Sequence, residues 1–123
     1  MADEIEIGSI GWVDMTSDEA PRLRDFYQHV VGWEPQGVSM GDYEDYNMLE
    51  PGSGTAAAGI CHARGVNAAF PPQWLVYITV ADIKKSAAIC REQGGSVLVE
   101  PGDSGICVIK DPSGAVAALY QPG

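Results

Sequence analysis

The sequence predicts an α+β fold built from two tandem βαβββ modules. The order strand, helix, strand, strand, strand can be traced twice along the 123 residues, and both halves contain a helix cap followed later by a Gly-rich turn. Asp18 corresponds to Asp82 at an offset of 64 residues, and Gly54 corresponds to Gly114 at an offset of 60 residues. Since 46% of the residues are hydrophobic and a half of about 60 residues is marginal alone, one domain is expected. Its modules span about residues 5–64 and 72–122.

The first module opens with a strand and a helix. Apolar residues recur at β-compatible spacing over Ile5–Met15, and the following segment TSDEA offers Ser17 or Asp18 as a helix N-cap. Pro21 is tolerated in a first helical turn, and Gly32 is a suitable end. The expected apolar face of this helix consists of Leu23, Phe26, Tyr27, Val30 and Val31.

Three short strands are expected after this helix, separated by turns at Gly41 and in EPGSG. They are Trp33–Met40, Tyr43–Leu49 and Thr55–His62. Between the second Gly-rich turn and the next module lies the connector ARGVNAAFPPQ.

The second module repeats the pattern. Trp74–Val80 is rich in β-branched and aromatic residues and is expected to be a strand. Asp82 is expected to cap a helix that ends at Gly94-Gly95 and turns Ile83, Ala87 and Cys90 inward. The last three strands are expected at Ser96–Glu100, Gly105–Lys110 and Ala115–Gln121.

The composition excludes several classes of partner. Seven Lys and Arg against 17 Asp and Glu give a net charge of −10, which repels nucleic acid and anionic membranes and attracts cationic ligands. The three cysteines lack C-x-x-C spacing, which suits a reducing compartment rather than a disulfide framework. No apolar run approaches the roughly 18 residues of a membrane span, and the N-terminus has no signal-peptide pattern. A soluble, cytoplasmic protein is expected.

Four phrases of the sequence resemble a known family. WVDMTSD, DFYQHVVGW, WLVYITVADI and DPSGA occur in the order seen in the vicinal oxygen chelate superfamily, which includes glyoxalase, bleomycin-resistance proteins and extradiol dioxygenases. The resemblance spans Ile10 to Pro122. It implies that the two modules form a curled mixed-sheet cleft of the glyoxalase type, and that the protein is a homodimer.

The resemblance also implies where a metal would bind. Metal-dependent members take ligands from the first and last strands of their modules, which here correspond to Gly11 or Trp12, Ala58, Leu75 and Ala118. None of these side chains binds metal, so neither a divalent metal nor another cofactor is expected. A displaced pair, Asp14 with His62, remains conceivable, although a well-held ion needs at least three protein ligands.

An aromatic-lined cleft is the expected ligand site. The candidate ligand-binding residues are Trp12, Asp14, Tyr46, His62, Trp74, Tyr77 and Tyr120. The alternative for each aromatic residue is an ordinary place in the core. The segment GDYEDYNM, which contains Asp42, Tyr43 and Asp45, is either a cation-binding surface or a simple hairpin turn.

Two functions are compatible with these residues. The first is a metal-free binding protein of the glyoxalase/bleomycin-resistance type that holds a small organic ligand. The second is a lyase or isomerase of the same superfamily that transfers a proton through Asp14, His62 or Tyr77. Asp14 is the candidate general base, because an acid between Val13 and Met15 in a strand is either partly buried or turned into the cleft. The sequence does not decide whether the protein is an enzyme.

Overall fold

The computed structural model describes residues 6–123 and confirms the predicted α+β fold. The βαβββ order occurs twice among these residues, and a 3-10 helix, η1 (Gly65–Asn67), lies in the connector. The elements of the first repeat are β1 (Ile10–Ser17), α1 (Ala20–Val31), β2 (Glu34–Ser39), β3 (Glu44–Leu49) and β4 (Ala56–His62). Those of the second are β5 (Trp74–Thr79), α2 (Ile83–Glu92), β6 (Ser96–Val99), β7 (Ile106–Lys110) and β8 (Val116–Tyr120).

The chain divides into two compact units. One unit, here called the N-terminal module, is Val13–Trp74, and its strands follow the order β2-β3-β4-β1. The other, the C-terminal module, contains Leu75–Gly123 together with residues 6–12, and its strands follow the order β5-β8-β7-β6. The first residues of β1 therefore belong with the C-terminal half of the chain. Two backbone hydrogen bonds illustrate this, since Gly8 donates to Thr79 and Thr79 donates to Ser9.

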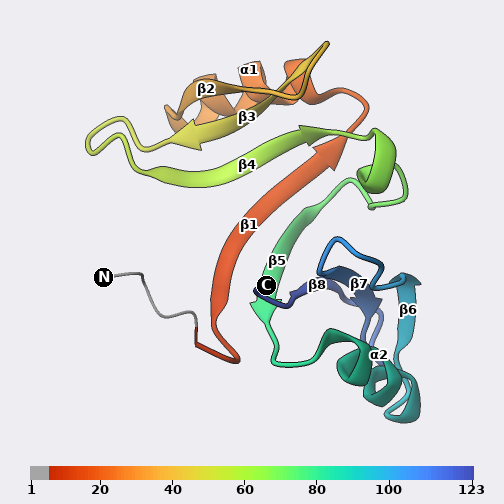
Figure 1. Cartoon of the computed structure of the whole chain (residues 1–123). Coiled ribbons are helices and arrows are strands. Elements are labelled where there is room, and N and C mark those ends of the chain that lie inside the picture. The colour runs from red at the N-terminus through yellow and green to blue at the C-terminus, as the bar shows by residue number, and fades with distance from the viewer. Residues whose placement is uncertain (1–5) are drawn as a thin grey trace. The chain divides into compact units, whose positions relative to one another are not determined.

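The N-terminal module is a mixed sheet with α1 along one face (Figure 1). β1 runs parallel to β4, with Asp14 paired to Gly59 and Ser17 paired to His62, whereas β3 is antiparallel to both β2 and β4. Ala20 of α1 packs with Tyr46, Met48 and Ile60 of the sheet to form the module's buried cluster. Paired residues on neighbouring strands share a face. This register therefore determines which side chains lie beneath α1.

The start of α1 differs from the expectation. Strand β1 continues to Ser17, whose hydroxyl accepts a hydrogen bond from the backbone N–H of Glu19, and Glu19 is the N-cap without a side-chain cap bond. The N-cap is therefore neither Ser17, which belongs to β1, nor Asp18, which precedes the N-cap Glu19. The end is as expected, since Gly32 adopts a left-handed conformation with φ 88°.

The outer half of the predicted apolar face of α1 is not buried. Leu23 and Tyr27 pack against the cluster, whereas Phe26 and Val30 are 53% and 64% exposed, and Val31 is exposed as well. Successive residues turn by about 100° around a helix, so the stripe centred on Ala20, Leu23 and Tyr27 faces the sheet and leaves the other side in solvent.

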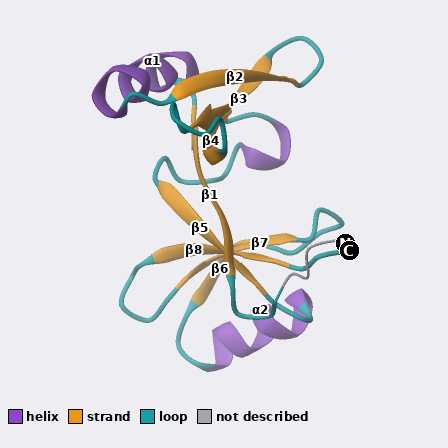
Figure 2. Cartoon of the chain, turned by 90° about the vertical axis from the view of Figure 1, so that its left-hand side faces the viewer, coloured by secondary structure: helices purple, strands orange, loops and turns teal. Residues whose placement is uncertain are grey.

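The C-terminal module has the corresponding arrangement. β5 runs parallel to β8, β8 and β7 are antiparallel, and β7 and β6 are antiparallel, while α2 lies beside β6 and β7 (Figure 2). Ile83 and Ala87 of α2 pack with Cys107 and Leu119. Asp82 caps α2 as predicted, since its carboxylate accepts a hydrogen bond of 3.1 Å from the backbone N–H of Lys85. Among the described residues, neither helix is long and apolar enough to cross a membrane.

The turn between β7 and β8 is held by one carboxylate, which makes it sensitive to pH. Asp111 accepts hydrogen bonds from the Ser113 hydroxyl at 2.7 Å, from the Ser113 backbone N–H at 2.8 Å and from the Ala115 backbone N–H at 3.0 Å. The Ser113 hydroxyl and these backbone groups lower the pKa of Asp111, because they stabilise its charged form. The turn is therefore stabilised above the ordinary carboxyl pKa, and this contribution is lost as pH falls through the lowered value.

An Asp111→Ala variant is expected to melt at a lower temperature than the wild type at neutral pH. The difference should shrink as the pH falls through the lowered pKa of Asp111, because protonation weakens the same hydrogen bonds in the wild type. Thermal melts over a pH series test this, with Asp103→Ala in the exposed loop before β7 as the control. Equal melting temperatures of wild type and Asp111→Ala at neutral pH would exclude a role for the turn.

Candidate functional site

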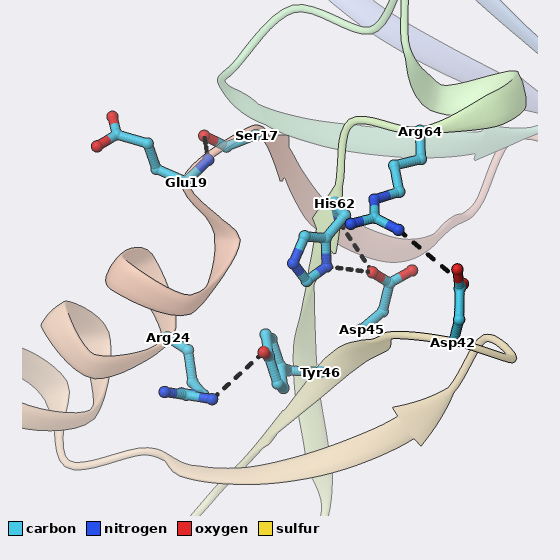
Figure 3. Close-up of polar contacts among 8 residues, drawn as sticks. All are labelled: Ser17, Glu19, Arg24, Asp42, Asp45, Tyr46, His62 and Arg64. Carbon is cyan, nitrogen blue, oxygen red and sulfur yellow. Dashed lines mark hydrogen bonds and ion pairs between the residues drawn. The ribbon is translucent and has the colours of Figure 1, made fainter.

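A hydrogen-bonded pair, Asp45 and His62, lies at the end of β4 in the N-terminal module (Figure 3). The Asp45 carboxylate accepts a hydrogen bond of 2.8 Å from the backbone N–H of His62, and the same oxygen lies 3.1 Å from His62 Nδ1. The side chains are only 10% and 14% exposed. A carboxylate has no proton to give, so Nδ1 carries the proton and donates it. The pair therefore fixes the orientation of the imidazole.

Aromatic rings and guanidinium groups surround His62. The ring of Tyr43 meets it nearly edge-on, with centroids 5.1 Å apart, and Tyr46 lies 6.1 Å away. Arg64 lies over the Tyr43 ring at 4.1 Å, while Arg24 lies over the Tyr46 ring at 4.9 Å and donates a hydrogen bond of 3.3 Å to its hydroxyl. The arrangement places a cation over each tyrosine ring. We call these six residues the His62 cluster: His62, Asp45, Tyr43, Tyr46, Arg24 and Arg64.

A second group of polar side chains lies on the opposite face of the same sheet. Asp14 and Thr16 of β1 pair with Gly59 and Cys61 of β4, and these positions alternate with those that face α1. Burial, followed by the negative charges of Asp14 and Asp45, raises the pKa of Cys61 to about 12. Asp45 thus acts on both groups, because it also contributes to the raised pKa of Cys61. We call the side of the sheet formed by Asp14, Thr16, Gly59 and Cys61 the Asp14 face.

Thr16 on the Asp14 face has an unusual environment. Its residue is 1% exposed, and its hydroxyl has no hydrogen-bond partner among residues 6–123. A buried hydroxyl without a partner costs about 1–3 kcal/mol. Such a group in a native protein calls for an explanation, of which an ordered water or a ligand atom is one.

Trp74 lies in the aromatic part of the N-terminal core. Its indole N–H donates a hydrogen bond of 3.1 Å to the Tyr27 hydroxyl, and its ring packs edge-on against both Tyr27 and Trp33. These rings pack against the cluster beneath α1. Trp74 therefore lies in the hydrophobic core of the N-terminal module, which was the alternative to a ligand-binding role. It is part of neither the Asp14 face nor the His62 cluster.

The remaining candidates belong to the C-terminal module. Tyr77 is buried and pairs with Ala118, and Tyr120 is partly buried and pairs with Thr79 and Ile106. These positions lie on the face of the sheet away from Ile78 and Leu119, which pack with α2. Trp12 is partly buried and, by strand alternation, lies on the same face of β1 as Asp14.

The register separates two residues that the sequence left as a conceivable metal pair. Asp14 lies on the face opposite α1, while His62 pairs with Ser17 on the other face. Over residues 6–123, no three His, Cys, Asp or Glu side chains lie together in a group that could hold a metal ion. The register therefore argues against Asp14 and His62 as ligands of one ion.

Sequence reasoning missed Thr16 and Arg24. Thr16 stands two positions after Asp14, so strand alternation alone would have placed both on one face. No sequence signal connects Arg24 with Tyr46, because their contact depends on how α1 crosses the sheet.

Comparison with known proteins identifies the family. Residues 9–119 match the family model described as Glyoxalase/Bleomycin resistance protein/Dioxygenase superfamily. A relative named putative glyoxylase CFP32 from Mycobacterium tuberculosis is 29% identical over 95% of this chain and 45% of its own length. The anthracycline biosynthesis protein DnrV of Streptomyces peucetius is 33% identical over 94% of this chain and 38% of its own length. The chain thus spans less than half of these curated relatives.

A solved structure supports the fold. A methylmalonyl-CoA epimerase in complex with methylmalonyl-CoA and NH4+ is similar with a TM-score of 0.52, covering 96% of each chain at 17% identity. At this identity the likeness concerns the fold alone.

Proposed function

Because the chain belongs to the Glyoxalase/Bleomycin resistance protein/Dioxygenase superfamily, we propose that it binds a small, planar organic molecule at the Asp14 face without a metal. The observation that carries this proposal is the Thr16 hydroxyl, which is buried and lacks a partner among the described residues. A ligand oxygen or nitrogen at this position would supply the missing hydrogen bond. The gain is large, because the group is already desolvated.

The charge of the Asp14 face indicates the kind of ligand. Asp14 and Asp45 are both close enough to Cys61 to raise its pKa, so two carboxylates lie around one strand position. Gly59 lies between Asp14 on β1 and Asn47 on β3 and contributes no side chain to this face. An acidic surface with polar neighbours and a gap between them suits a flat molecule that carries hydroxyl or amino groups.

The named relatives are consistent with such a ligand. One of them is called an anthracycline biosynthesis protein and shares 33% of the aligned residues. Anthracyclines are planar polycyclic aromatic compounds with several hydroxyl and carbonyl oxygens, and many carry a basic amine. We therefore propose an anthracycline-like aromatic compound as the ligand class of this chain.

Fluorescence titration with an anthracycline tests the proposal. Asp14→Asn and Thr16→Val are each expected to weaken binding by about tenfold or more, since hydrogen bonds to desolvated or charged groups are worth about 1–3 kcal/mol. Thr16→Val is also expected to raise the free energy of unfolding by about 1 kcal/mol, because it removes a buried hydroxyl without a partner. The combination of higher stability and weaker binding separates a ligand contact from a folding defect.

Asp103→Asn, in an exposed loop of the C-terminal module, is the matched control and should bind like the wild type. Undiminished binding by both Asp14→Asn and Thr16→Val would place the ligand elsewhere. No binding by the wild type would reject this ligand class.

We also propose that the chain forms a homodimer, as the family resemblance implied. The exposed apolar side chains Phe26, Val30 and Val31 on α1 support this, because exposed apolar patches are often association surfaces.

A further inference from the structure

The His62 cluster and the proposed ligand site share Asp45, but the imidazole and the Asp14 side chain lie on different faces of the sheet. His62 pairs with Ser17 of β1, and Tyr46 lies opposite Ile60 in the buried cluster beneath α1. Strand alternation therefore directs both side chains to the α1 side of the sheet, whereas Asp14 and Thr16 lie on the other side. A ligand at His62 Nε2 would therefore lie on the α1 side of the sheet, and a ligand at Asp14 on the other side.

The geometry of the pair leaves one reactive atom. Asp45 occupies His62 Nδ1, and Figure 3 shows the second ring nitrogen on the side of the ring away from Asp45. In the neutral imidazole, a proton on Nδ1 leaves Nε2 as a base with a lone pair.

The surroundings of Nε2 combine aromatic rings with positive charge. Tyr43 and Tyr46 flank the imidazole, and Arg64 lies over the Tyr43 ring and Arg24 over the Tyr46 ring. The other charged and titratable groups of the cluster are Asp42, which pairs with Arg64 at 4.0 Å, Asp25, which pairs with Arg24 at 2.9 Å, and the Cys61 thiol next to Asp45. Aromatic ligands pack well on such rings, and guanidinium groups stabilise a nearby anion.

We infer that His62 is a proton-accepting site for an aromatic ligand with an acidic hydroxyl group, that is, a phenol or enol. The ligand O–H proton moves to Nε2, the O–H electron pair stays on the oxygen, and an imidazolium and a phenolate or enolate result. Asp45 is the positioning residue that keeps the proton of neutral His62 on Nδ1. The two arginines supply the positive charge that the new anion requires.

Binding of 4-nitrophenol tests the inference, because its absorbance distinguishes the phenol from the phenolate. Wild type should bind it and shift part of the bound dye to phenolate at a pH below the pKa of the free dye. The ether 4-nitroanisole, which has no proton to give, should bind at least tenfold more weakly. His62→Gln should not shift the bound dye to phenolate and should bind it at least tenfold more weakly than wild type. The control His29→Gln, which replaces the other histidine, should behave like wild type.

The result also separates this inference from the proposed function. Phenol binding that persists in His62→Gln but is lost in Asp14→Asn would overturn the inference and assign the phenol to the Asp14 face. Absence of any 4-nitrophenol binding by the wild type would overturn it too, whatever the result of the anthracycline titration.

The role of Asp45 has its own spectroscopic signature. Nitrogen-15 NMR of the wild type should show neutral His62 protonated at Nδ1, and Asp45→Ala should shift the population toward the Nε2–H tautomer. His29, whose Nδ1 lies 2.7 Å from the backbone oxygen of Asp25, is the internal reference in the same spectrum. A wild-type His62 protonated mainly at Nε2 would contradict the inference. This measurement uses the wild type alone, so it does not depend on how well Asp45→Ala folds.

Discussion

Iodoacetamide is expected to alkylate Cys61 in the folded protein about a thousandfold more slowly than an ordinary thiol at mildly alkaline pH. Only the thiolate reacts, and the pKa of Cys61 is raised from 9.0 to about 12, chiefly by burial and then by the charges of Asp14 and Asp45. Three pKa units reduce the thiolate fraction by about a factor of 1,000. Alkylation of Cys61 should accelerate only as the pH approaches 12.

Peptide-resolved mass spectrometry measures this rate beside that of Cys90, which is partly exposed. The same protein in denaturant is the control, because unfolding removes the burial and should make all three cysteines react alike. Equal rates for Cys61 in the folded and denatured protein would show that the Cys61 thiol is not protected and that its pKa is not raised in the folded protein.

Replacement of Met48 by alanine is expected to lower the free energy of unfolding by about 2–5 kcal/mol. Met48 is 0% exposed and packs with Ala20, Tyr46 and Ile60 beneath α1, so its removal leaves a cavity in the N-terminal module. Met48→Leu, which nearly conserves the volume, should cost less than about 1.5 kcal/mol.

Urea denaturation provides the measurement, and the chain contains a matched control. Met40 lies between β2 and β3 and is 47% exposed, so Met40→Ala should change the stability by no more than about 0.5 kcal/mol. Equal losses for Met48→Ala and Met40→Ala would mean that the cluster beneath α1 does not hold the N-terminal module together.

The element order was predictable because local signals mark it. Gly32 ends α1 in a left-handed conformation and Asp82 caps α2, and both residues can be read from their neighbours in the sequence. The start of α1 was predicted incorrectly, because Ser17 belongs to β1. Periodicity indicated the apolar face of α1 but not how much of it the sheet covers, and Phe26, Val30 and Val31 are exposed.

The candidate site could be predicted only in part, because it depends on register. Asp14 and His62 were each singled out from the sequence, but only the parallel pairing of β1 with β4 places them on opposite faces. The partner of His62 is Asp45, 17 residues away on β3, and the sequence showed this residue only as one acid in a run of polar residues. Thr16 looked like an ordinary strand residue, since the lack of a partner for its hydroxyl is a property of the folded chain.

Native mass spectrometry of protein purified without chelator and mixed with an anthracycline tests the central proposal most directly. We expect one ligand bound per chain in a dimer without a divalent ion, and loss of the ligand in Asp14→Asn. A stoichiometric divalent ion on the wild type, or equal ligand retention by wild type and Asp14→Asn, would contradict metal-free binding at the Asp14 face.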